Sequence, residues 1–175
     1  MKLSSLNIFK NNDQIALVGS GGKTSILFGI AKELFSDNCF VTTTTKMWIR
    51  ESKYADHAFK IDRVDSIDMG FGKGINFVYK RIDSLEPEKV NGFEEDQLKV
   101  LSKKLKELNI PLLIEADGSK QKPIKFPASH EPVIPKFINK VCLIVGLSAI
   151  GQNLSSNNFH RPELISAAIN LPLGS

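Results

Sequence analysis

Hydrophobic positions near the start of the chain predict a strand, a tight turn and a helix in succession. Residues 15–18 form an apolar run that stops at a glycine-rich segment, residues 19–22, as a buried strand does where it enters a turn. Apolar side chains then recur at helical spacing at Ile26, Leu27, Ile30, Ala31 and Leu34. The polar residues 36–38 predict the end of this helix.

A second strand is predicted directly after this helix. Residues 39–41 are apolar, and four threonines over residues 42–45 continue the run with β-branched side chains, which suit strands. A strand, a helix and a second strand make a βαβ unit, which is typical of parallel sheets because parallel strands need a crossover connection. We therefore expect an α/β fold, doubly wound around a mostly parallel sheet and built in three layers.

Leucine spacing predicts one further helix. Asn91 followed by Glu94 is typical of a capping box at a helix start, and leucines follow at steps of three and four residues, at Leu98, Leu101, Leu105 and Leu108. Acidic residues early in this segment and lysines late in it match the helix dipole. The charges of this helix therefore need no functional interpretation.

Apolar runs predict two further buried strands, over residues 110–114 and 141–146. The segment between them contains four of the eight prolines and is expected to be a loop that follows a defined path. Residues 47–88 are rich in Asp, Lys and Gly, and only residues 75–81 among them predict a strand. The remainder of that segment stays unassigned.

Composition narrows the class of protein. A chain of 175 residues that is 42% hydrophobic and 24% charged can form an ordinary core, which excludes disorder as the main state. No apolar run approaches the roughly 20 residues of a membrane helix, and polar residues interrupt the N-terminal stretch too early for a signal peptide. We expect a single domain over residues 1–175, a cytoplasmic location and no membrane partner. Cys39 and Cys142 lie in apolar runs and are interpreted as small buried hydrophobes.

The net charge of +4 and the pI near 9.0 raise the question of nucleic-acid binding. Two segments carry the excess: residues 1–50 hold six basic and three acidic side chains, and residues 117–140 hold five basic and two acidic ones. Because the excess is local, it favours a compact anionic ligand over a long phosphate backbone. The aromatic residues lie mostly in apolar runs rather than among basic ones, so we do not expect a nucleic-acid partner.

A glycine-rich loop lies where the first strand becomes the first helix, and it reads Gly19-Ser20-Gly21-Gly22-Lys23-Thr24. Successive backbone N–H groups and the helix N-terminus would point into one concavity there, which suits a phosphate and predicts a fold like that of P-loop NTPases. Lys23 is expected to neutralise the β and γ phosphates, and the hydroxyl of Thr24 to bind Mg²⁺. The loop has the shorter GxxGKT form, because Leu17 stands where the longer loop has its first glycine. A plain strand-to-helix turn is the alternative interpretation.

A P-loop needs an acidic group at the end of a neighbouring strand to hold Mg²⁺, and Glu115 directly follows the predicted strand over residues 110–114. Asp117 lies two residues further along and would face the same way on a continuing strand. One carboxylate is expected to hold the metal, and the other to polarise a water or a substrate hydroxyl or to act as a second metal ligand. A simple turn at Asp117 and Gly118 is the alternative.

Two residues at the end of the second predicted strand are candidates for the same crevice. In a doubly wound sheet the carboxyl ends of the strands line the ligand site. Thr45 and Lys46 occupy this end, so we expect them to contact the ligand, whereas Thr42 is interpreted as structural.

Basic and histidine side chains further along the chain complete the set of candidates. Lys120 and Lys125 follow in a lysine-rich loop and are expected to stabilise transferred or leaving charge, unless they form a solvated face. His130 and His160 suit proton transfer near neutral pH, although loop hydrogen bonding is the alternative for each histidine. Arg161 suits a clamp on an anion. A zinc site from His130 and His160 would lack a third ligand at a supporting spacing.

Several of these motifs together resemble one protein family. The string Glu115-Ala116-Asp117-Gly118-Ser119-Lys120, followed by Pro123, Lys125, Pro127 and HEPVIP over residues 130–135, closely resembles the YqeC family. The glycine loop, TTTTKM over residues 42–47, VGL over residues 145–147 and HRPE over residues 160–163 resemble the pattern of that family in the same order. The family is described as accessory proteins of selenium cofactor biosynthesis or of selenium-dependent molybdenum hydroxylases.

The resemblance implies a P-loop nucleotide-binding fold and a role in maturing a labile selenium and molybdenum cofactor in the bacterial cytosol. We expect Mg²⁺ with ATP or GTP as the cofactor, and hydrolysis or transfer of the γ phosphate as the reaction. A selenium or molybdopterin species would be the second substrate, and a hydroxylase or another maturation protein would be a partner. The alternative is a non-catalytic carrier or metallochaperone for the cofactor that uses the nucleotide only as a switch.

Length is the last aspect of the resemblance. Members of the family are usually longer and continue into another strand with a nucleotide-base-reading NK motif, which does not occur before Ser175. We therefore expect a form truncated at its C-terminus. Since no base-reading motif is visible, ATP and GTP remain equal alternatives.

Overall fold

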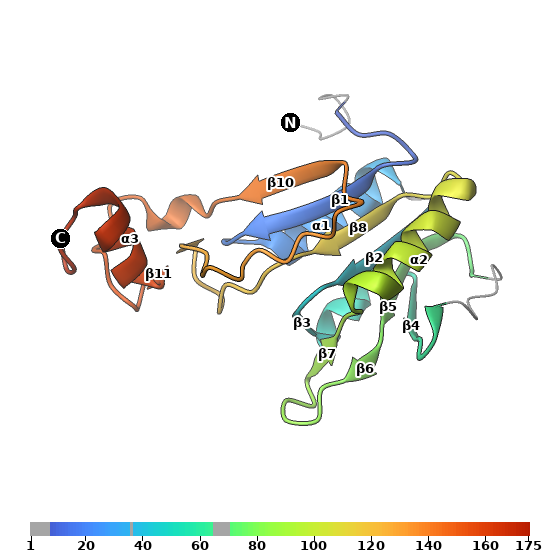
Figure 1. Cartoon of the computed structure of the whole chain (residues 1–175), viewed down its shortest axis with the longest axis horizontal. Helices are drawn as coiled ribbons and strands as arrows, with labels where there is room; N and C mark the ends of the chain where they lie inside the picture. Colours follow the sequence, from blue (N-terminus) through green and yellow to red (C-terminus); the bar gives the residue numbers. More distant parts are fainter. Residues whose placement is uncertain (1–7, 36, 65–70) are drawn as a thin grey trace.

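A parallel β-sheet forms the centre of the molecule (Figure 1). The protein is described by a computed structural model over residues 8–35, 37–64 and 71–175. The six strands of the sheet run in the order β10-β1-β8-β2-β5-β4, and each pairing within it is parallel. Their bounds are Gln14–Gly19 for β1, Asn38–Thr43 for β2, His57–Lys60 for β4, Gly74–Tyr79 for β5, Leu112–Glu115 for β8 and Lys140–Ile144 for β10.

Helices cover both faces of this sheet. The helix α1, Lys23–Leu34, packs its buried apolar side chains on one face, and α2, Glu95–Glu107, packs its own on the other (Figure 1). Because successive side chains of a strand point to opposite faces, Leu113 joins the core under α1 while Leu112 and Ile114 join the core under α2. The predicted doubly wound α/β fold with three layers is confirmed. Among the described residues, no helix has the length and apolarity that crossing a membrane requires.

The carboxyl ends of three adjacent strands meet at one edge of the sheet. Glu115, the last residue of β8, lies in register with Leu17 of β1 and with Thr43 of β2. The strand β1 continues from that row to Gly19, where the glycine loop begins. Because parallel strands all end at the same edge, the glycine loop, Glu115 and the end of β2 are neighbours.

Smaller elements surround this edge. A three-stranded antiparallel sheet has the order β3-β7-β6, with bounds Lys46–Trp48, Lys89–Asn91 and Arg81–Ile82, and the 3-10 helix η2, Ile49–Tyr54, follows β3. The parallel pair β9, Ile124–Lys125, and β11, Phe159–His160, precedes α3, Pro162–Ile169, and the 3-10 helix η4 spans Leu147–Ala149. Residues 47–88, mostly unassigned from the sequence, thus contain parts of both larger sheets, and residues 65–70 lie outside the described residues.

The start of α2 differs from the predicted one. Asn91 belongs to β7, where it pairs with Lys46 and donates its side-chain N–H to Asp83 Oδ2 at 2.9 Å. The capping box is formed instead by Glu94 and Gln97, and the backbone N–H of Glu94 donates to Gln97 Oε1 at 3.4 Å. The prediction of Asn91 as the cap was wrong because a distant carboxylate takes up its side chain.

The second strand ends earlier than the threonine run predicts. The strand β2 stops at Thr43, and Lys46 already begins β3. The N–H of Thr44 donates to Glu115 O at 3.0 Å, whereas the carbonyl of Thr45 accepts the N–H of Gly92 at 3.1 Å. The threonine run is therefore divided between the central sheet and the three-stranded sheet of β3, β7 and β6, which is called the small sheet below.

The strand β10 lies at an edge of the sheet and its side chains are exposed on one face, so its predicted burial is wrong. Its described strand neighbour is β1 alone, and the side chains of Val141 and Leu143 are 53% and 70% exposed. The alternate residues Cys142 and Ile144 pack against the core under α1. Cys142 is therefore half-buried, while Cys39 in β2 is fully buried as predicted.

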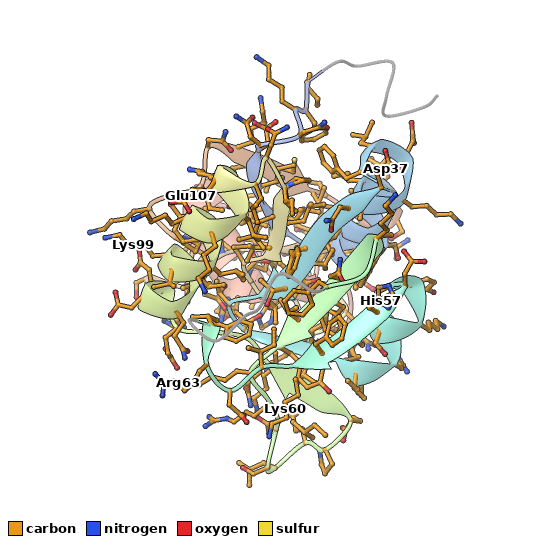
Figure 2. The ribbon with its side chains drawn as sticks, turned by 90° about the vertical axis from the view of Figure 1, so that its right-hand side faces the viewer. Asp37, His57, Lys60, Arg63, Lys99 and Glu107 are labelled. Carbon is orange, nitrogen blue, oxygen red and sulfur yellow. The ribbon has the colours of Figure 1, made fainter. Side chains whose placement is uncertain are left out.

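The two sides of α2 offer a test of this packing. Leu101 is fully buried against the sheet, whereas Val100 is 42% exposed on the outer side, from which Lys99 and Glu107 project (Figure 2). We expect Leu101→Ala to lower the free energy of unfolding by about 2–5 kcal/mol, because it removes buried surface and leaves a cavity. Val100→Ala is the control and is expected to change it by about 0.5 kcal/mol or less. Urea denaturation measures both, and equal losses would contradict the assignment of faces.

Candidate functional site

The glycine loop after β1 has a backbone that only glycine adopts freely. Gly19, Gly21 and Gly22 have φ angles of 94°, 83° and 109°, in the left-handed region. A Cβ atom on Gly19 would lie 2.2 Å from the carbonyl oxygen of Ile144, and one on Gly21 would lie 2.3 Å from the Cα atom of Gly146. The loop can therefore pass close to the end of β10 because these two residues have no side chain.

The loop leads directly into α1. Gly22 is the N-cap of this helix and provides no side-chain hydrogen bond. The first N–H groups of an α-helix have no partner within the helix, and they carry the positive end of its dipole. Lys23 is the first helical residue, and its side chain folds back over the loop so that Nζ donates to Gly19 O at 2.7 Å. Bare N–H groups and a lysine thus converge at one place, which suits an anion such as phosphate.

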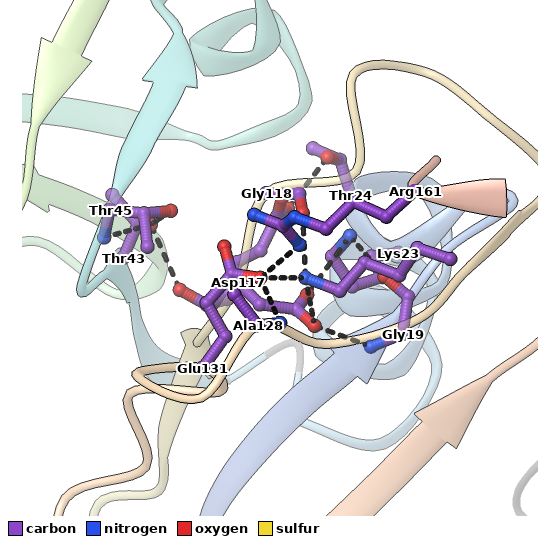
Figure 3. A network of polar contacts seen from close by, with 12 residues as sticks. Gly19, Lys23, Thr24, Thr43, Thr45, Asp117, Gly118, Ala128, Glu131 and Arg161 are labelled. Carbon is purple, nitrogen blue, oxygen red and sulfur yellow. Dashed lines mark hydrogen bonds and ion pairs between the residues drawn. The ribbon is translucent and has the colours of Figure 1, made fainter. Parts of the chain in front are cut away.

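A buried carboxylate holds this lysine. Asp117 Oδ1 lies 3.1 Å from Lys23 Nζ (Figure 3). Asp117 Oδ2 lies 2.9 Å from Lys125 Nζ. Asp117 Oδ2 also accepts the backbone N–H of Gly19 at 2.9 Å. All three side chains are 3% exposed or less, so Asp117 offsets part of the charge of both buried lysines inside the protein.

Glu115 and Thr24 form a second polar pair beside the loop. The hydroxyl of Thr24 donates to Glu115 Oε2 at 2.7 Å. Burial raises the pKa of Glu115, although Lys23 and the bond from Thr24 act in the opposite direction. A cation at this carboxylate would therefore relieve an unfavourable buried charge.

These oxygens are compatible with Mg²⁺, which prefers hard oxygen ligands. No group of three or more His, Cys, Asp or Glu side chains suited to a metal occurs among the described residues. Mg²⁺ bound by one or two protein side chains together with substrate phosphates and water fits this donor set better than a metal held by protein alone. Thr24 and Glu115 are the two side chains that would hold it.

The ion pairs continue from Lys125 away from the glycine loop. Glu131 Oε2 lies 3.2 Å from Lys125 Nζ and accepts a bond from Arg161 Nη1 at 2.6 Å. It also accepts the backbone N–H of Ala128 at 3.3 Å. Partial burial raises the pKa of Glu131, but the bonds from Arg161, Ala128 and Lys125 outweigh burial and lower it to about 2. The chain of alternating charges therefore ties the loop after β8 to the start of α3.

One cavity of about 860 Å³ opens onto this site. Its walls come from the glycine loop and the start of α1, from β3 and η2, from residues 118–121 and from the start of α3. Nine of the residues predicted from the sequence line it: Gly21, Gly22, Lys23, Thr24, Thr45, Lys46, Glu115, Lys120 and Arg161. The fold thus brings together side chains that are far apart in the sequence.

The other five predicted residues do not line this cavity. Gly19 and Ser20 lie at the base of the loop, where the N–H of Ser20 donates to Ile144 O at 2.8 Å. Asp117 and Lys125 are buried behind the loop in the ion pairs described above. His130 is exposed, in the segment between β9 and β10. Asp117 thus differs from the predicted free base or metal ligand, because both of its oxygens already face cations or an N–H group.

The threonines divide into structural and cavity-lining ones. Thr42 is buried and its hydroxyl donates to Val78 O at 2.8 Å, which confirms its structural role. Thr43 was not singled out from the sequence, yet its hydroxyl donates to Glu115 O at 2.9 Å and lies 3.2 Å from the hydroxyl of Thr45. It therefore joins the end of β2 to the end of β8, and strand alternation alone does not distinguish it from its neighbours.

Other cavity residues escaped the sequence analysis. Glu131 gave no signal of its own, because its role depends on Arg161 thirty residues away. His160 was weighed from the sequence for proton transfer and as a zinc ligand but not chosen as a site residue, and it lines the same cavity as Lys23. Partial burial lowers the pKa of His160, and the positive charges of Arg161, Lys120 and Lys125 lower it further, against the effect of Glu131. Its neutral form is therefore favoured near pH 7.

Comparison with known proteins identifies the family. The family of the YqeC protein matches residues 15–163, from β1 to the start of α3. The chain belongs to the YqeC family. It is 34% identical over 149 residues to a protein of Escherichia coli (strain K12) that bears the name "Uncharacterized protein YqeC". The match covers 84% of this chain and 57% of that YqeC protein, so the chain spans little more than half the length of this relative.

No solved structure matches the chain. The YqeC match includes the glycine loop, the carboxylates Glu115 and Asp117, and the segment that contains Arg161. The family resemblance noted from those motifs is therefore confirmed, while the chemistry of the site rests on its geometry.

The ion pairs of Glu131 predict a pH dependence of stability. Its folded pKa of about 2 lies below the ordinary 4.5, so the carboxylate stabilises the fold above pH 4.5 and loses this effect as the pH falls toward 2. We expect Glu131→Gln to unfold at lower urea concentration than the wild type at pH 7, and this difference to shrink between pH 4.5 and pH 2. Glu107→Gln on the outer face of α2 is the control and should stay near the wild type throughout. A difference that does not change with pH would contradict the assignment.

Proposed function

We propose that the chain binds a nucleoside triphosphate with Mg²⁺ at the glycine loop and hydrolyses or transfers its γ phosphate. The observation that carries this proposal is the convergence of three features on one cavity. These are the glycine loop at the N-terminus of α1, the buried Lys23, and the pair that Thr24 of α1 makes with Glu115 at the end of β8. Each feature suits one part of a magnesium-bound triphosphate.

The residues have separate roles in this proposal. The N–H groups of the loop and of the first turn of α1 bind phosphate oxygens, and Lys23 offsets their charge. Thr24 and Glu115 hold Mg²⁺, which when bound neutralises charge on the transferred phosphoryl group. Thr45, Lys46, Lys120 and Arg161 line the remainder of the cavity around the reacting groups. ATP and GTP fit equally, because nothing at the described site selects the base.

Asp117 positions the cations rather than acting on the substrate. It accepts Gly19 N–H and faces both Lys23 and Lys125, so it fixes where the positive charge of the loop lies. A phosphate that draws Lys23 away leaves Asp117 paired with Lys125. The proton acceptor for a water or an acceptor hydroxyl is better supplied by His160, whose lowered pKa favours the neutral imidazole.

Family membership extends the proposal to a biological role. Belonging to the YqeC family supports a role in selenium-related cofactor biosynthesis, and we place the reaction in the maturation of a selenium- and molybdenum-dependent hydroxylase in the cytoplasm. A selenium or molybdopterin species is the second substrate in this view, and the hydroxylase or another maturation protein is the partner. The volume of the cavity, about 860 Å³, accommodates a second ligand beside the phosphates.

A non-catalytic carrier that uses the nucleotide as a switch is the second candidate. The ion pairs supply the observation in its favour, because they link Lys23 to Arg161 through Asp117, Lys125 and Glu131. A ligand that displaces Lys23 would perturb the whole chain of charges as far as α3. Phosphate release separates the two candidates: the carrier would bind the nucleotide and hydrolyse it slowly until its partner is added.

Calorimetric titration of ATP and GTP, each with Mg²⁺, tests the central claim. We expect the wild type to bind at least one of them and Lys23→Ala to bind it more weakly by a factor on the order of 10–100, because a charge-assisted contact is lost. Lys99→Ala on the outer face of α2 is the matched control and should bind as the wild type does. Circular dichroism confirms that each variant is folded. Equal affinities of Lys23→Ala and the wild type would refute the proposal.

Glu115→Gln separates metal binding from folding. Burial raises the pKa of Glu115, so a neutral amide at this position removes an unfavourable charge and can still accept the Thr24 hydroxyl. We expect the ligand-free variant to have a Tm at or above that of the wild type at pH 7. The additional rise in Tm that Mg²⁺ produces with the nucleotide should disappear. A lower Tm together with an unchanged Mg²⁺ effect would contradict the assignment of Glu115 to the metal.

A further inference from the structure

The wall of the cavity formed by the small sheet carries a group of basic side chains, and the proposed function gives a role to Lys46 alone among them. This cationic wall consists of Lys46 and Trp48 of β3, Arg50 of η2 and Lys89 of β7, and all four line the same cavity as the glycine loop. The wall and the loop are separate in the sequence, and strand pairing between β3 and β7 assembles the wall. The cavity therefore has two positively charged sides.

Trp48 organises two of these cations. The guanidinium carbon of Arg50 lies 4.6 Å from the centroid of the Trp48 ring system, and Lys89 Nζ lies 5.0 Å from it. Both distances are within the range of cation–π attraction. The indole thus holds two flexible basic side chains near one another and offsets part of the repulsion between their positive charges.

Carboxylates outside the cavity lining support the same wall. Lys46 Nζ lies 3.0 Å from Asp83 Oδ2 and 2.8 Å from Glu86 Oε2, and Lys89 Nζ also pairs with Glu86. Neither Asp83 nor Glu86 lines the cavity, whereas both lysines do. The negative charges therefore anchor the lysines and leave cationic groups at the cavity surface. The hydrogen bonds from Glu86 and Asp83 raise the pKa of Lys46 and keep it charged.

One carboxylate of the wall does line the cavity. Glu51 lies 3.5 Å, Oε1 to Nε, from Arg50 and offsets part of its charge. On this side of the cavity, the lining therefore contains three cations, Lys46, Arg50 and Lys89, and one carboxylate, Glu51, while Asp83 and Glu86 lie outside the lining. An oxyanion between these side chains would receive several charge-assisted hydrogen bonds.

We propose that the cationic wall of Lys46, Trp48, Arg50 and Lys89 binds a phosphate or carboxylate group of the second substrate, opposite the glycine loop. This inference rests on the proposed function, which supplies the second substrate, but anion binding at the wall does not itself require the nucleotide. According to this inference, the second substrate carries an oxyanion group, which the wall holds apart from the triphosphate.

The composition of the chain provides a direct probe, because Trp48 is its sole tryptophan. Intrinsic fluorescence of the folded protein is recorded during titration with inorganic pyrophosphate and, separately, with citrate. Each titration is made without nucleotide and with a saturating non-hydrolysable triphosphate analogue and Mg²⁺. We expect a saturable change in Trp48 emission that persists when the analogue is bound. A response to pyrophosphate alone identifies a phosphate group as the ligand, and a response to citrate identifies carboxylates.

Variants connect this signal to the wall. The double variant Arg50→Gln, Lys89→Gln is expected to weaken anion binding roughly tenfold or more, because it removes two charge-assisted contacts. Lys99→Gln is the control and should bind as the wild type does. Calorimetry with the same anions repeats the comparison without relying on the indole, and circular dichroism confirms the fold.

Three results would overturn the inference: no saturable response to either anion, equal binding by the double variant, or loss of the response when the analogue occupies the glycine loop. The last result would assign the wall to the nucleotide itself. Failure of the proposed function is distinct, because it appears as absence of nucleotide binding in the wild type while the anion response of Trp48 is retained.

Discussion

The pairing of one buried carboxylate with two buried lysines governs the architecture of the site. Lys23 and Lys125 lie almost entirely beneath the surface, where an isolated ammonium would be strongly disfavoured, and Asp117 between them makes their burial tolerable. The same carboxylate accepts the N–H of Gly19. It thereby fixes the end of β1, the start of α1 and the strand β9 relative to one another. The remaining contacts of the site extend from this arrangement.

Charged side chains extend from this centre on two sides. On one side Glu131 and Arg161 continue the chain to the start of α3. On the other side the cavity separates Lys23 from Lys46, Arg50 and Lys89, whose counter-charges lie largely outside the cavity lining. Positive charge is thus concentrated at both sides of one space, while each lysine has a carboxylate partner in the fold. Such a space favours anionic ligands through both its shape and its field.

Elements whose contacts are local could be predicted well. The strand before the glycine loop, the helix after it and the leucine-rich helix α2 follow from periodicity over a few residues, because burial of one face imposes that spacing. The cap of α2 was assigned three residues too early, since the side chain of Asn91 is bound by Asp83, which directly follows β6. The apolar run of β10 was taken as buried, although a run of this kind does not reveal whether a strand has one neighbour or two.

The sequence by itself determined the fold class, the glycine loop and the position of Glu115, because each depends on neighbouring residues along the chain or on strand ends meeting at one edge. Only the tertiary structure decided that Asp117 faces two lysines, that His130 lies outside the cavity and that Trp48 gathers cations opposite the loop. These features arise from side chains that meet across long stretches of sequence. Their energies depend on burial and on distance in space, and neither quantity can be read from the order of the residues.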